Sequence, residues 1–234
     1  MTNEKPSYPK FSYDEHARTC AIDDLLGQTR RTVQGVPVSD DQIQMIITAI
    51  KSGLAFKPDD VLLELACGNG VLSQALFDSC KDYLGVDLSE YLISVAKKKF
   101  EVLPHYRFSV QGAAEYVRQE LQPERFSKVL CYAGFQYFSS DEVAEILRTL
   151  FEKFINVQTV FIGNLPDKER AAKFYKEKQP GTEELSDCST AIGVWRTQNE
   201  FARLVGGTGW KIRFSNMPPE FHGSYYRYDA LLSR

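Results

Sequence analysis

The chain has 234 residues, a formal net charge of −3 at pH 7 and 43% hydrophobic residues. This length and apolar content suit one domain with an elaborated end, or one domain with a small cap. The slight acidic excess argues against a nucleic-acid partner, because a phosphate-binding surface needs concentrated Lys and Arg.

Cysteine usage and hydropathy indicate a reducing, aqueous compartment. The five cysteines are scattered and form neither a C-x-x-C pair nor a Cys/His spacing typical of zinc. The N-terminus lacks the apolar stretch of a signal peptide, and no apolar run approaches membrane-spanning length. We therefore expect a soluble cytoplasmic protein without a membrane partner.

Residues 1–57 are predicted to form an N-terminal tail and a helical cap. The first 12 or so residues are polar and contain two prolines, as in a surface tail. Apolar spacing over residues 14–27 permits a short helix, and the basic stretch 28–35 is expected to be irregular. Ser39 and the two acidic residues after it are typical of the start of another helix.

A strand, a glycine turn and a helix follow the cap. Val61–Leu65 is a short apolar run of the kind that forms a strand buried on both faces. Gly68 and Gly70 come next, and residues 71–77 resume with helical spacing. The glycines let the backbone turn sharply and let a ligand approach closely. The free N–H groups at a helix start suit a carboxylate or phosphate.

A second buried strand, Tyr83–Asp87, ends in an acid 17 residues after Gly70. An acid at this place is the usual hydrogen-bond acceptor for a ribose diol. Strands and helices then alternate: helix 89–100, strand 105–110, a helix from 112, strand 126–132, a helix from 139, strand 157–163, helix 197–206, and strands 210–217 and 224–232. This alternation predicts a parallel sheet with helices on both faces.

The combination Glu64-x-Ala66-x-Gly68-x-Gly70 with Asp87 resembles the class I S-adenosylmethionine (SAM)-dependent methyltransferases. The acid Glu64 separates it from the dinucleotide pattern, whose glycines are spaced G-x-G-x-x-G without a preceding acid.

This resemblance covers residues 58–234. It implies an α/β fold with a doubly wound, seven-stranded, mostly parallel sheet whose last strand is antiparallel. Residues 58–234 would form the SAM-binding domain. The charged, loop-like region at about 164–196 would be an insertion that covers the substrate.

The resemblance also implies SAM as cofactor and S-adenosylhomocysteine (SAH) as product. Glu64 would bind the amino end of SAM or orient the loop, and Asp87 would bind the ribose. The predicted cofactor-binding residues are Glu64, Ala66, Gly68, Gly70, Asp87, Leu88, Gly112, Ala113, Ala114 and Tyr132. Related enzymes often carry an acid at the position of Ala113, so either Glu115 replaces that acid or the backbone holds the adenine amine.

Ligands of an open parallel sheet bind beyond the carboxyl ends of its strands. The Asn/Asp-Pro-Pro-Tyr/Phe motif of DNA and protein-glutamine N-methyltransferases is missing at residues 133–138, and acids that would hold a metal are missing after strands four and five. We therefore expect no metal. The predicted acceptor-binding residues are Arg30, Arg31, Phe135, Gln136, Tyr137, Asn164 and Tyr226. The two arginines would recognise an anionic group, although an exposed basic loop explains them equally well.

Methyl transfer to an alcohol benefits from a general base, and His is well matched to neutral pH. His222 belongs to the sheet edge where ligands bind, because the last strand is antiparallel and begins there. His16 is a second candidate if the N-terminal segment folds over the site. Each of them is also explained as a surface or packing imidazole. His105 precedes the third strand and belongs to the opposite edge.

We therefore predict a SAM-dependent methyltransferase that acts on a small molecule. The expected acceptor is a hydroxyl of a sugar, a polysaccharide precursor or a secondary metabolite. The alternatives are a small-molecule N-methyltransferase and a SAM-binding regulatory protein without turnover. A nicotinamide-dependent oxidoreductase is disfavoured by the glycine spacing.

Overall fold

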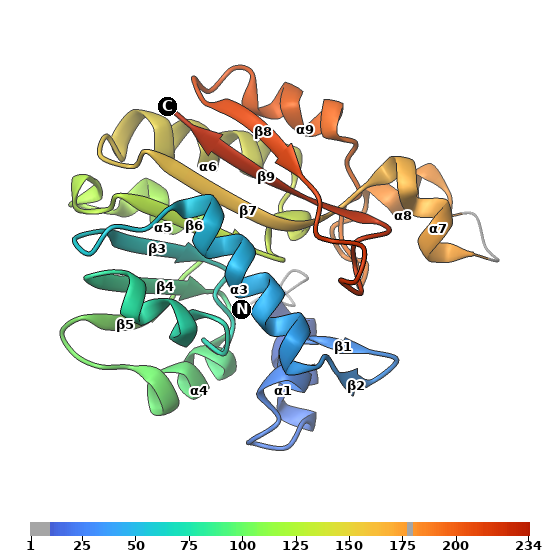
Figure 1. The fold of residues 1–234 in the computed structure, drawn as a ribbon, viewed down its shortest axis with the longest axis horizontal. Helices are drawn as coiled ribbons and strands as arrows, with labels where there is room; N and C mark the ends of the chain where they lie inside the picture. Colours follow the sequence, from blue (N-terminus) through green and yellow to red (C-terminus); the bar gives the residue numbers. More distant parts are fainter. Residues whose placement is uncertain (1–9, 177–179) are drawn as a thin grey trace, which may run out of the picture.

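The computed structural model describes residues 10–176 and 180–234, and its main feature is a seven-stranded sheet with the order β5-β4-β3-β6-β7-β9-β8. Neighbouring strands from β5 to β7 pair in parallel, and β9 is antiparallel to both β7 and β8. The strands are β3 (Val61–Leu65), β4 (Asp82–Asp87), β5 (Tyr106–Val110), β6 (Lys128–Tyr132), β7 (Thr159–Pro166), β8 (Lys211–Ser215) and β9 (Arg227–Ser233). The predicted doubly wound α/β fold is confirmed (Figure 1).

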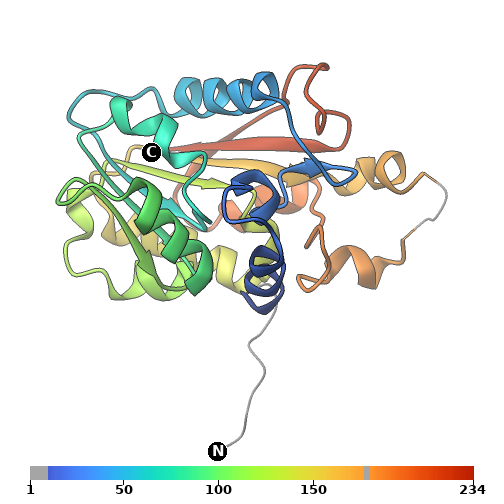
Figure 2. The same cartoon turned by 90° about the horizontal axis from the view of Figure 1, so that it is seen from below.

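Helices cover both faces of the sheet and give three layers (Figure 2). One face is covered by α3 (Asp40–Leu54), the 3₁₀ helix η1 (Ser73–Ser79) and α4 (Glu90–Phe100). The other face is covered by α5 (Ala113–Gln119), α6 (Ser140–Lys153) and α9 (Gln198–Val205). Two short 3₁₀ helices flank β6, namely η2 (Pro123–Arg125) and η3 (Phe135–Tyr137). None of the helices in these described residues is both long enough and apolar enough to span a bilayer.

Helix α6 shows how local sequence sets these layers. The Ser139 hydroxyl accepts from the Glu142 N–H (3.2 Å), and the Glu142 carboxylate accepts from the Ser139 N–H (2.8 Å), which closes a capping box. Its apolar stripe of Val143, Ile146, Leu147 and Leu150 is fully buried against the sheet.

The chain after the glycine turn differs from the sequence prediction. Residues 73–79 wind as the 3₁₀ helix η1, whereas an α-helix was expected from residue 71. Its turns close over three residues, as in the bond from Ala75 N–H to Leu72 O (3.2 Å). The hydroxyl of Ser73 is held by the carboxylate of Glu64 (2.6 Å), so the first turn follows that contact instead of the ideal helical path.

The N-terminal segment contains two helices and a hairpin. The short helix predicted over 14–27 is divided into α1 (Lys10–Thr19) and α2 (Leu25–Gln28), because Asp24 caps a new helix start by accepting from Gly27 N–H (2.9 Å). The stretch expected to be irregular forms the hairpin β1 (Thr32–Val33) and β2 (Val36–Pro37). Gln34 and Gly35 at its tip have φ of 52° and 80°, as a two-residue hairpin turn requires.

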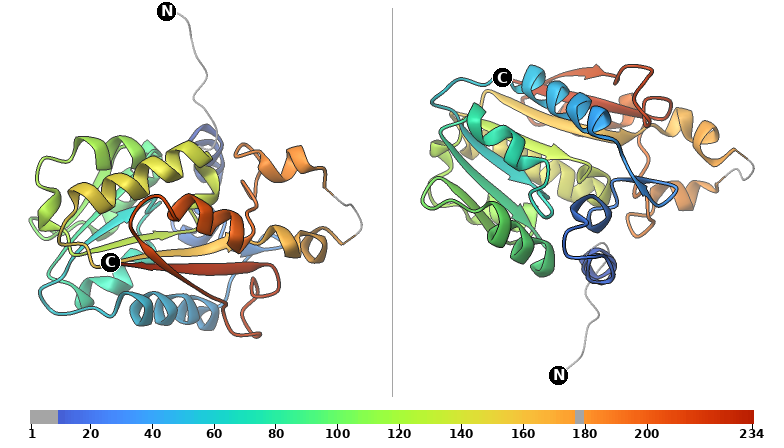
Figure 3. Two further views of the ribbon diagram at one scale, coloured as in Figure 1. Left: turned by 90° about the horizontal axis from the view of Figure 1, so that it is seen from above. Right: turned by 60° about the horizontal axis from the view of Figure 1, so that its bottom comes forward.

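The region after β7 contains short elements. They are η4 (Lys168–Arg170), α7 (Ala171–Tyr175) and α8 (Thr182–Ser186). Figure 3 shows α7 and α8 beyond the ends of β7 and β9, set apart from the layers of the sheet. They pack around Trp195 and Tyr226, which form a small apolar cluster of their own. Sequence periodicity did not indicate these elements, because none of them exceeds five residues.

Candidate active site

The turn after β3 brings the backbone into left-handed conformations. Ala66, Gly68 and Gly70 have φ of 58°, 60° and 77°. Glycine adopts these angles without strain, which explains its use at 68 and 70, whereas Ala66 carries a Cβ in this conformation. A Cβ added to Gly134, after β6, would lie 2.6 Å from the Cβ of Ala66. The loops after β3 and β6 therefore adjoin at the carboxyl edge.

Glu64, near the end of β3, forms hydrogen bonds to two residues around this turn. Its side chain is buried, and Oε2 accepts from Ser73 Oγ (2.6 Å) and from Tyr83 Oη (2.7 Å). Burial raises the pKa of Glu64, while these two hydrogen bonds and the charge of Arg31 oppose the shift. Of its two predicted roles, orientation of the loop is the one for which the structure shows contacts.

Asp87 ends β4 with its carboxylate turned toward the glycine turn. Its Oδ2 accepts from Gly68 N–H (2.8 Å) and its Oδ1 from Ser89 N–H (2.9 Å). Burial raises the pKa of Asp87, and the two N–H donors oppose that shift. Each carboxylate oxygen keeps further acceptor capacity, so both can serve a pair of ribose hydroxyls.

An exposed apolar side chain, Leu88, follows Asp87 directly. Leu88 is exposed, and a Cβ added to Gly112 would lie 3.2 Å from its Cδ2, so the two residues adjoin. Ala113 is buried and Ala114 is half-buried in the first turn of α5, while Glu115 is exposed there. Asp87 thus contacts the glycine turn, and Leu88 adjoins Gly112 at the same edge of the sheet.

The N-terminal cap closes on this turn. Asn69 Nδ2 donates to Leu25 O (2.9 Å) and to Gln28 Oε1 (3.0 Å), and Ser89 Oγ donates to the carboxylate of Asp14. His16 joins α1 to α2 within the cap, with Nε2 2.8 Å from Gly27 O. This contact occupies one ring nitrogen of His16.

The segment after β6 contains two buried polar atoms that have no hydrogen-bond partner within the described part of the chain, Tyr132 Oη and Gln136 Oε1. Gln136 Nε2 donates to Ala133 O (2.9 Å). Tyr137 Oη donates to Ala191 O (2.9 Å), which ties this segment to the insertion. Phe135, predicted to contact the acceptor, is instead fully buried in the core on the α6 side.

The end of β7 forms a β-bulge against β9. Asn164 lies in the bulge with φ of 67°, donates its N–H to Asp229 Oδ1 (2.7 Å) and accepts from Arg227 Nη1 through its carbonyl (2.5 Å). Burial raises the pKa of Asp229 to about 6, although the Asn164 bond and Arg227 oppose the shift. Sequence analysis did not select Arg227 or Asp229. The available signal was a pair of charged residues two positions apart in a core strand, because such residues share one face of the sheet.

His222 lies in the loop before β9 and is held by Gln42 of α3. Gln42 Oε1 accepts from the His222 N–H (2.8 Å) and lies 3.0 Å from His222 Nδ1. Gln42 Nε2 donates to Glu220 O (3.0 Å), which fixes the orientation of the amide. Since an amide oxygen only accepts, Nδ1 carries the ring proton and Nε2 of the neutral ring is free to accept one.

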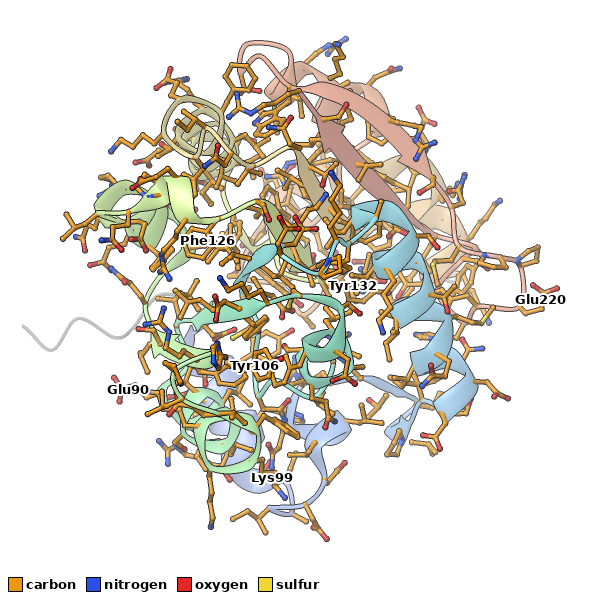
Figure 4. The ribbon with its side chains drawn as sticks, turned by 60° about the vertical axis from the view of Figure 1, so that its left-hand side comes forward. Glu90, Lys99, Tyr106, Phe126, Tyr132 and Glu220 are labelled. Atoms are coloured by element: carbon orange, nitrogen blue, oxygen red, sulfur yellow. The ribbon has the colours of Figure 1, made fainter. Side chains whose placement is uncertain are left out.

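The surroundings of His222 favour the neutral ring. Burial lowers its pKa, and the charges of Arg227 and Arg31 lower it further. In Figure 4, Tyr132 lies beside α3, and Glu220 marks the loop that contains His222.

The two arginines predicted to bind the acceptor differ in their exposure to solvent. Arg31 is half-buried, with Cζ 5.3 Å from the centroid of the Tyr132 ring. Arg30 is exposed, with Cζ 5.8 Å from the Tyr13 ring. Tyr226 is buried against Trp195, with ring centroids 5.7 Å apart, so it belongs to the insertion cluster.

Two cavities, of about 450 and 430 Å³, lie elsewhere in the molecule. Their linings include Arg107 and Arg125, and neither includes the glycine turn, Asp87 or His222. The candidate site is placed at the glycine turn and Asp87, because ligands of an open parallel sheet bind beyond the carboxyl ends of its strands. Within residues 10–176 and 180–234, no group of three or more His, Cys, Asp or Glu residues is arranged to hold a metal.

Comparison with known sequences finds a methyltransferase domain in part of the chain. A family model described as "Methyltransferase domain" matches residues 62–153. An uncharacterized methyltransferase of Schizosaccharomyces pombe is 40% identical over 50 residues, which are 21% of this chain and 16% of the relative. The match thus spans about a sixth of that relative's length.

Solved structures share the fold at low sequence identity. A SAM-dependent methyltransferase from Leishmania major has a TM-score of 0.67 at 13% identity, covering 96% of this chain and 82% of that one. Magnesium protoporphyrin IX methyltransferase from Synechocystis with bound SAM has a TM-score of 0.59 at 14% identity, covering 97% and 92%. A cyclopropane synthase from Mycobacterium tuberculosis has a TM-score of 0.62 at 11% identity, covering 84% and 95%. Residues 62–153 therefore match a methyltransferase domain, and the chain shares its fold with solved SAM-dependent methyltransferases.

Proposed function

We propose that this protein methylates a hydroxyl group of a small molecule, with His222 as the general base. The observation that carries the proposal is the pair of bonds from Gln42, which leaves Nε2 of a neutral His222 free to accept a proton. His222 begins the segment that leads into β9, at the carboxyl edge where Asp87 and the glycine turn also lie.

SAM supplies an activated methyl group, so the protein mainly aligns the acceptor and removes its proton. As the acceptor oxygen forms a bond to the methyl carbon, the carbon–sulfur bond breaks and its electron pair stays on sulfur. The hydroxyl proton goes to Nε2 of His222. The lowered pKa keeps the imidazole neutral at neutral pH and therefore available.

The assigned roles follow the contacts. Asp87 would bind the ribose hydroxyls, and Leu88 would pack against the adenine. Glu64 would hold the glycine turn through Ser73 and Tyr83. Gln136 would offer its unpaired Oε1 to the acceptor. We further propose that the cap, residues 1–57, and the insertion at about 164–196 enclose a small acceptor.

The test is transfer of labelled methyl groups from SAM to a panel of hydroxylated sugars, sugar nucleotides and phenols. His222→Asn is compared with His105→Asn, whose ring binds Asp82 (2.7 Å) at the other edge of the sheet. We expect His222→Asn to lower kcat by about 100-fold or more with unchanged SAH affinity, and His105→Asn to behave as wild type. Wild-type turnover by His222→Asn would refute the base assignment.

The same panel of acceptors distinguishes the proposed function from the two alternative functions. Methylation of amines only, with no effect of His222→Asn, would support an N-methyltransferase, since an amine needs less help from a base. SAH binding without turnover on any acceptor would favour a regulatory SAM-binding protein.

A further inference from the structure

Two guanidinium groups meet beside Tyr132 at the carboxyl edge of the sheet. Arg31 precedes the hairpin before α3 and lies over the Tyr132 ring at 5.3 Å, and Arg227 begins β9. Burial lowers the pKa of Arg31, and Arg227 contributes to this shift by like-charge repulsion. The same two charges act on the pKa of His222. The charges of the two arginines therefore reach each other and His222.

Part of the hydrogen-bonding capacity of this region is not used. Arg31 Nε and Tyr132 Oη are both buried and have no partner in the parts of the chain that the structure describes. Tyr132 is only 3% exposed, so water does not replace that partner at its surface. Arg227 donates to the neutral carbonyl of Asn164 (2.5 Å). Neither arginine forms an ion pair with a described carboxylate.

Glu64 and Asp229 act on the two arginines through their charge, but neither carboxylate forms an ion pair with them. Glu64 Oε2 is shared by the hydroxyls of Ser73 and Tyr83, and Asp229 Oδ1 accepts from Asn164 N–H. Two partly buried guanidinium groups without a counter-ion are costly. A planar guanidinium binds carboxylates and phosphates through paired hydrogen bonds. The arrangement calls for an anion from outside the chain.

We infer that Arg31, Arg227 and the Tyr132 hydroxyl form a subsite for an anionic group, a carboxylate or a phosphate, carried by the acceptor. This inference rests on the proposed function, because it places the anion beside the base His222. It narrows the substrate class to hydroxy acids and phosphorylated alcohols.

The order of strands favours the acceptor over the cofactor as the source of the anion. Asp87 and the glycine turn follow β4 and β3, whereas Arg227 belongs to β9, which lies beyond β6 and β7. Arg227 is bonded to the bulge at Asn164 and not to the glycine turn. Arg227 thus lies on a strand that is separated from β4, which carries the acid assigned to the ribose.

The first experiment measures the thermal midpoint of SAH-saturated protein against millimolar inorganic phosphate and acetate, with ionic strength held constant by NaCl. We compare wild type with Arg31→Gln and Arg227→Gln. Arg213→Gln is the control, because Arg213 is exposed on β8. We expect a saturable rise of about 2 °C or more in wild type and in the control, and loss of the rise in both variants. Arg31→Gln removes no hydrogen bond of the described fold, so its result stands even if Arg227→Gln unfolds.

The outcomes distinguish the sources of the anion and separate this inference from the proposed function. An equal rise in all four proteins, or in none, overturns the subsite. A tenfold loss of SAH affinity in Arg31→Gln and Arg227→Gln, with unchanged affinity for 5′-methylthioadenosine, assigns the pair to the cofactor carboxylate and overturns the acceptor assignment. His222→Asn should keep the phosphate response, so failure of the base assignment leaves this result intact.

A second experiment compares acceptors in matched pairs, such as salicylate and salicylamide, in methyl transfer by wild type. For a pair that the enzyme methylates, we expect the kcat/KM of the acid to be at least about tenfold higher than that of the amide. Arg31→Gln should remove this preference, mainly by raising the KM of the acid. Equal use of acid and amide contradicts the inference.

Discussion

Gln42 Oε1 binds His222 twice, at the backbone N–H (2.8 Å) and at Nδ1 (3.0 Å), and so links the first turn of α3 to a loop 180 positions away. This contact selects the tautomer of His222, with the proton on Nδ1 and Nε2 free to accept one. Gln42 is therefore a positioning residue for the base.

Gln42→Glu should move the acid limb of the pH profile of kcat/KM to higher pH. A carboxylate at this place favours the imidazolium and raises the pKa of His222, whereas Arg227 and Arg31 lower it in the wild type. Since the base must be neutral, activity then begins about one pH unit higher. Gln44→Glu, an exposed position on the same helix, is the control. An unshifted profile would show that His222 is not the group whose protonation sets the acid limb of kcat/KM.

Asp87→Ala should weaken SAH binding tenfold or more, roughly the 1.4 kcal/mol of one good polar contact. The carboxylate both anchors Gly68 N–H (2.8 Å) and is placed for the ribose. Asp82→Ala is the matched control, because Asp82 begins the same strand at the other edge and binds His105. Calorimetry that gave equal SAH affinity for wild type and Asp87→Ala would refute the ribose assignment.

Asp229→Asn should stabilise the protein without ligand at pH 8. Burial raises the pKa of Asp229 from 3.8 to about 6, so its contribution to stability is present below pH 3.8 and is lost as pH rises through about 6. This difference corresponds to at most roughly 3 kcal/mol. The amide oxygen of Asn can still accept from Asn164 N–H. Urea titrations between about pH 4 and pH 8 should show a flatter pH dependence for the variant, and lower stability at pH 8 would contradict the assignment.

Arg31→Met should raise the midpoint of urea unfolding of the ligand-free protein. The charged side chain is disfavoured in the fold, because burial and Arg227 together outweigh the favourable charges of Tyr132, Glu64 and Tyr13. Replacing it with an apolar side chain of similar length should add about 1 kcal/mol. Arg30→Met, at the exposed neighbouring position, should change stability little. A loss of stability in Arg31→Met larger than that in Arg30→Met would show that Arg31 serves the fold.

Local sequence determined the framework of the cofactor site. The apolar run of β3, the glycines at 68 and 70 and the acid that ends β4 lie within 27 residues, and their order alone predicts a strand, a turn and a ribose acceptor. Strand and helix alternation determined the doubly wound sheet, because backbone periodicity is a local property. The winding of η1 was missed, since it depends on the contact of Ser73 with Glu64.

Only the tertiary structure decided which side chains surround the acceptor. His222 was selected from its place in the chain, but its partner Gln42 had no sequence signal, and the charge of Arg227 reaches Arg31 only in the folded chain. The same holds for Asp229, whose raised pKa comes from burial beside the bulge at Asn164. Periodicity and turn residues record the conformation of a segment, whereas protonation and pairing depend on the groups that distant segments bring within a few ångströms.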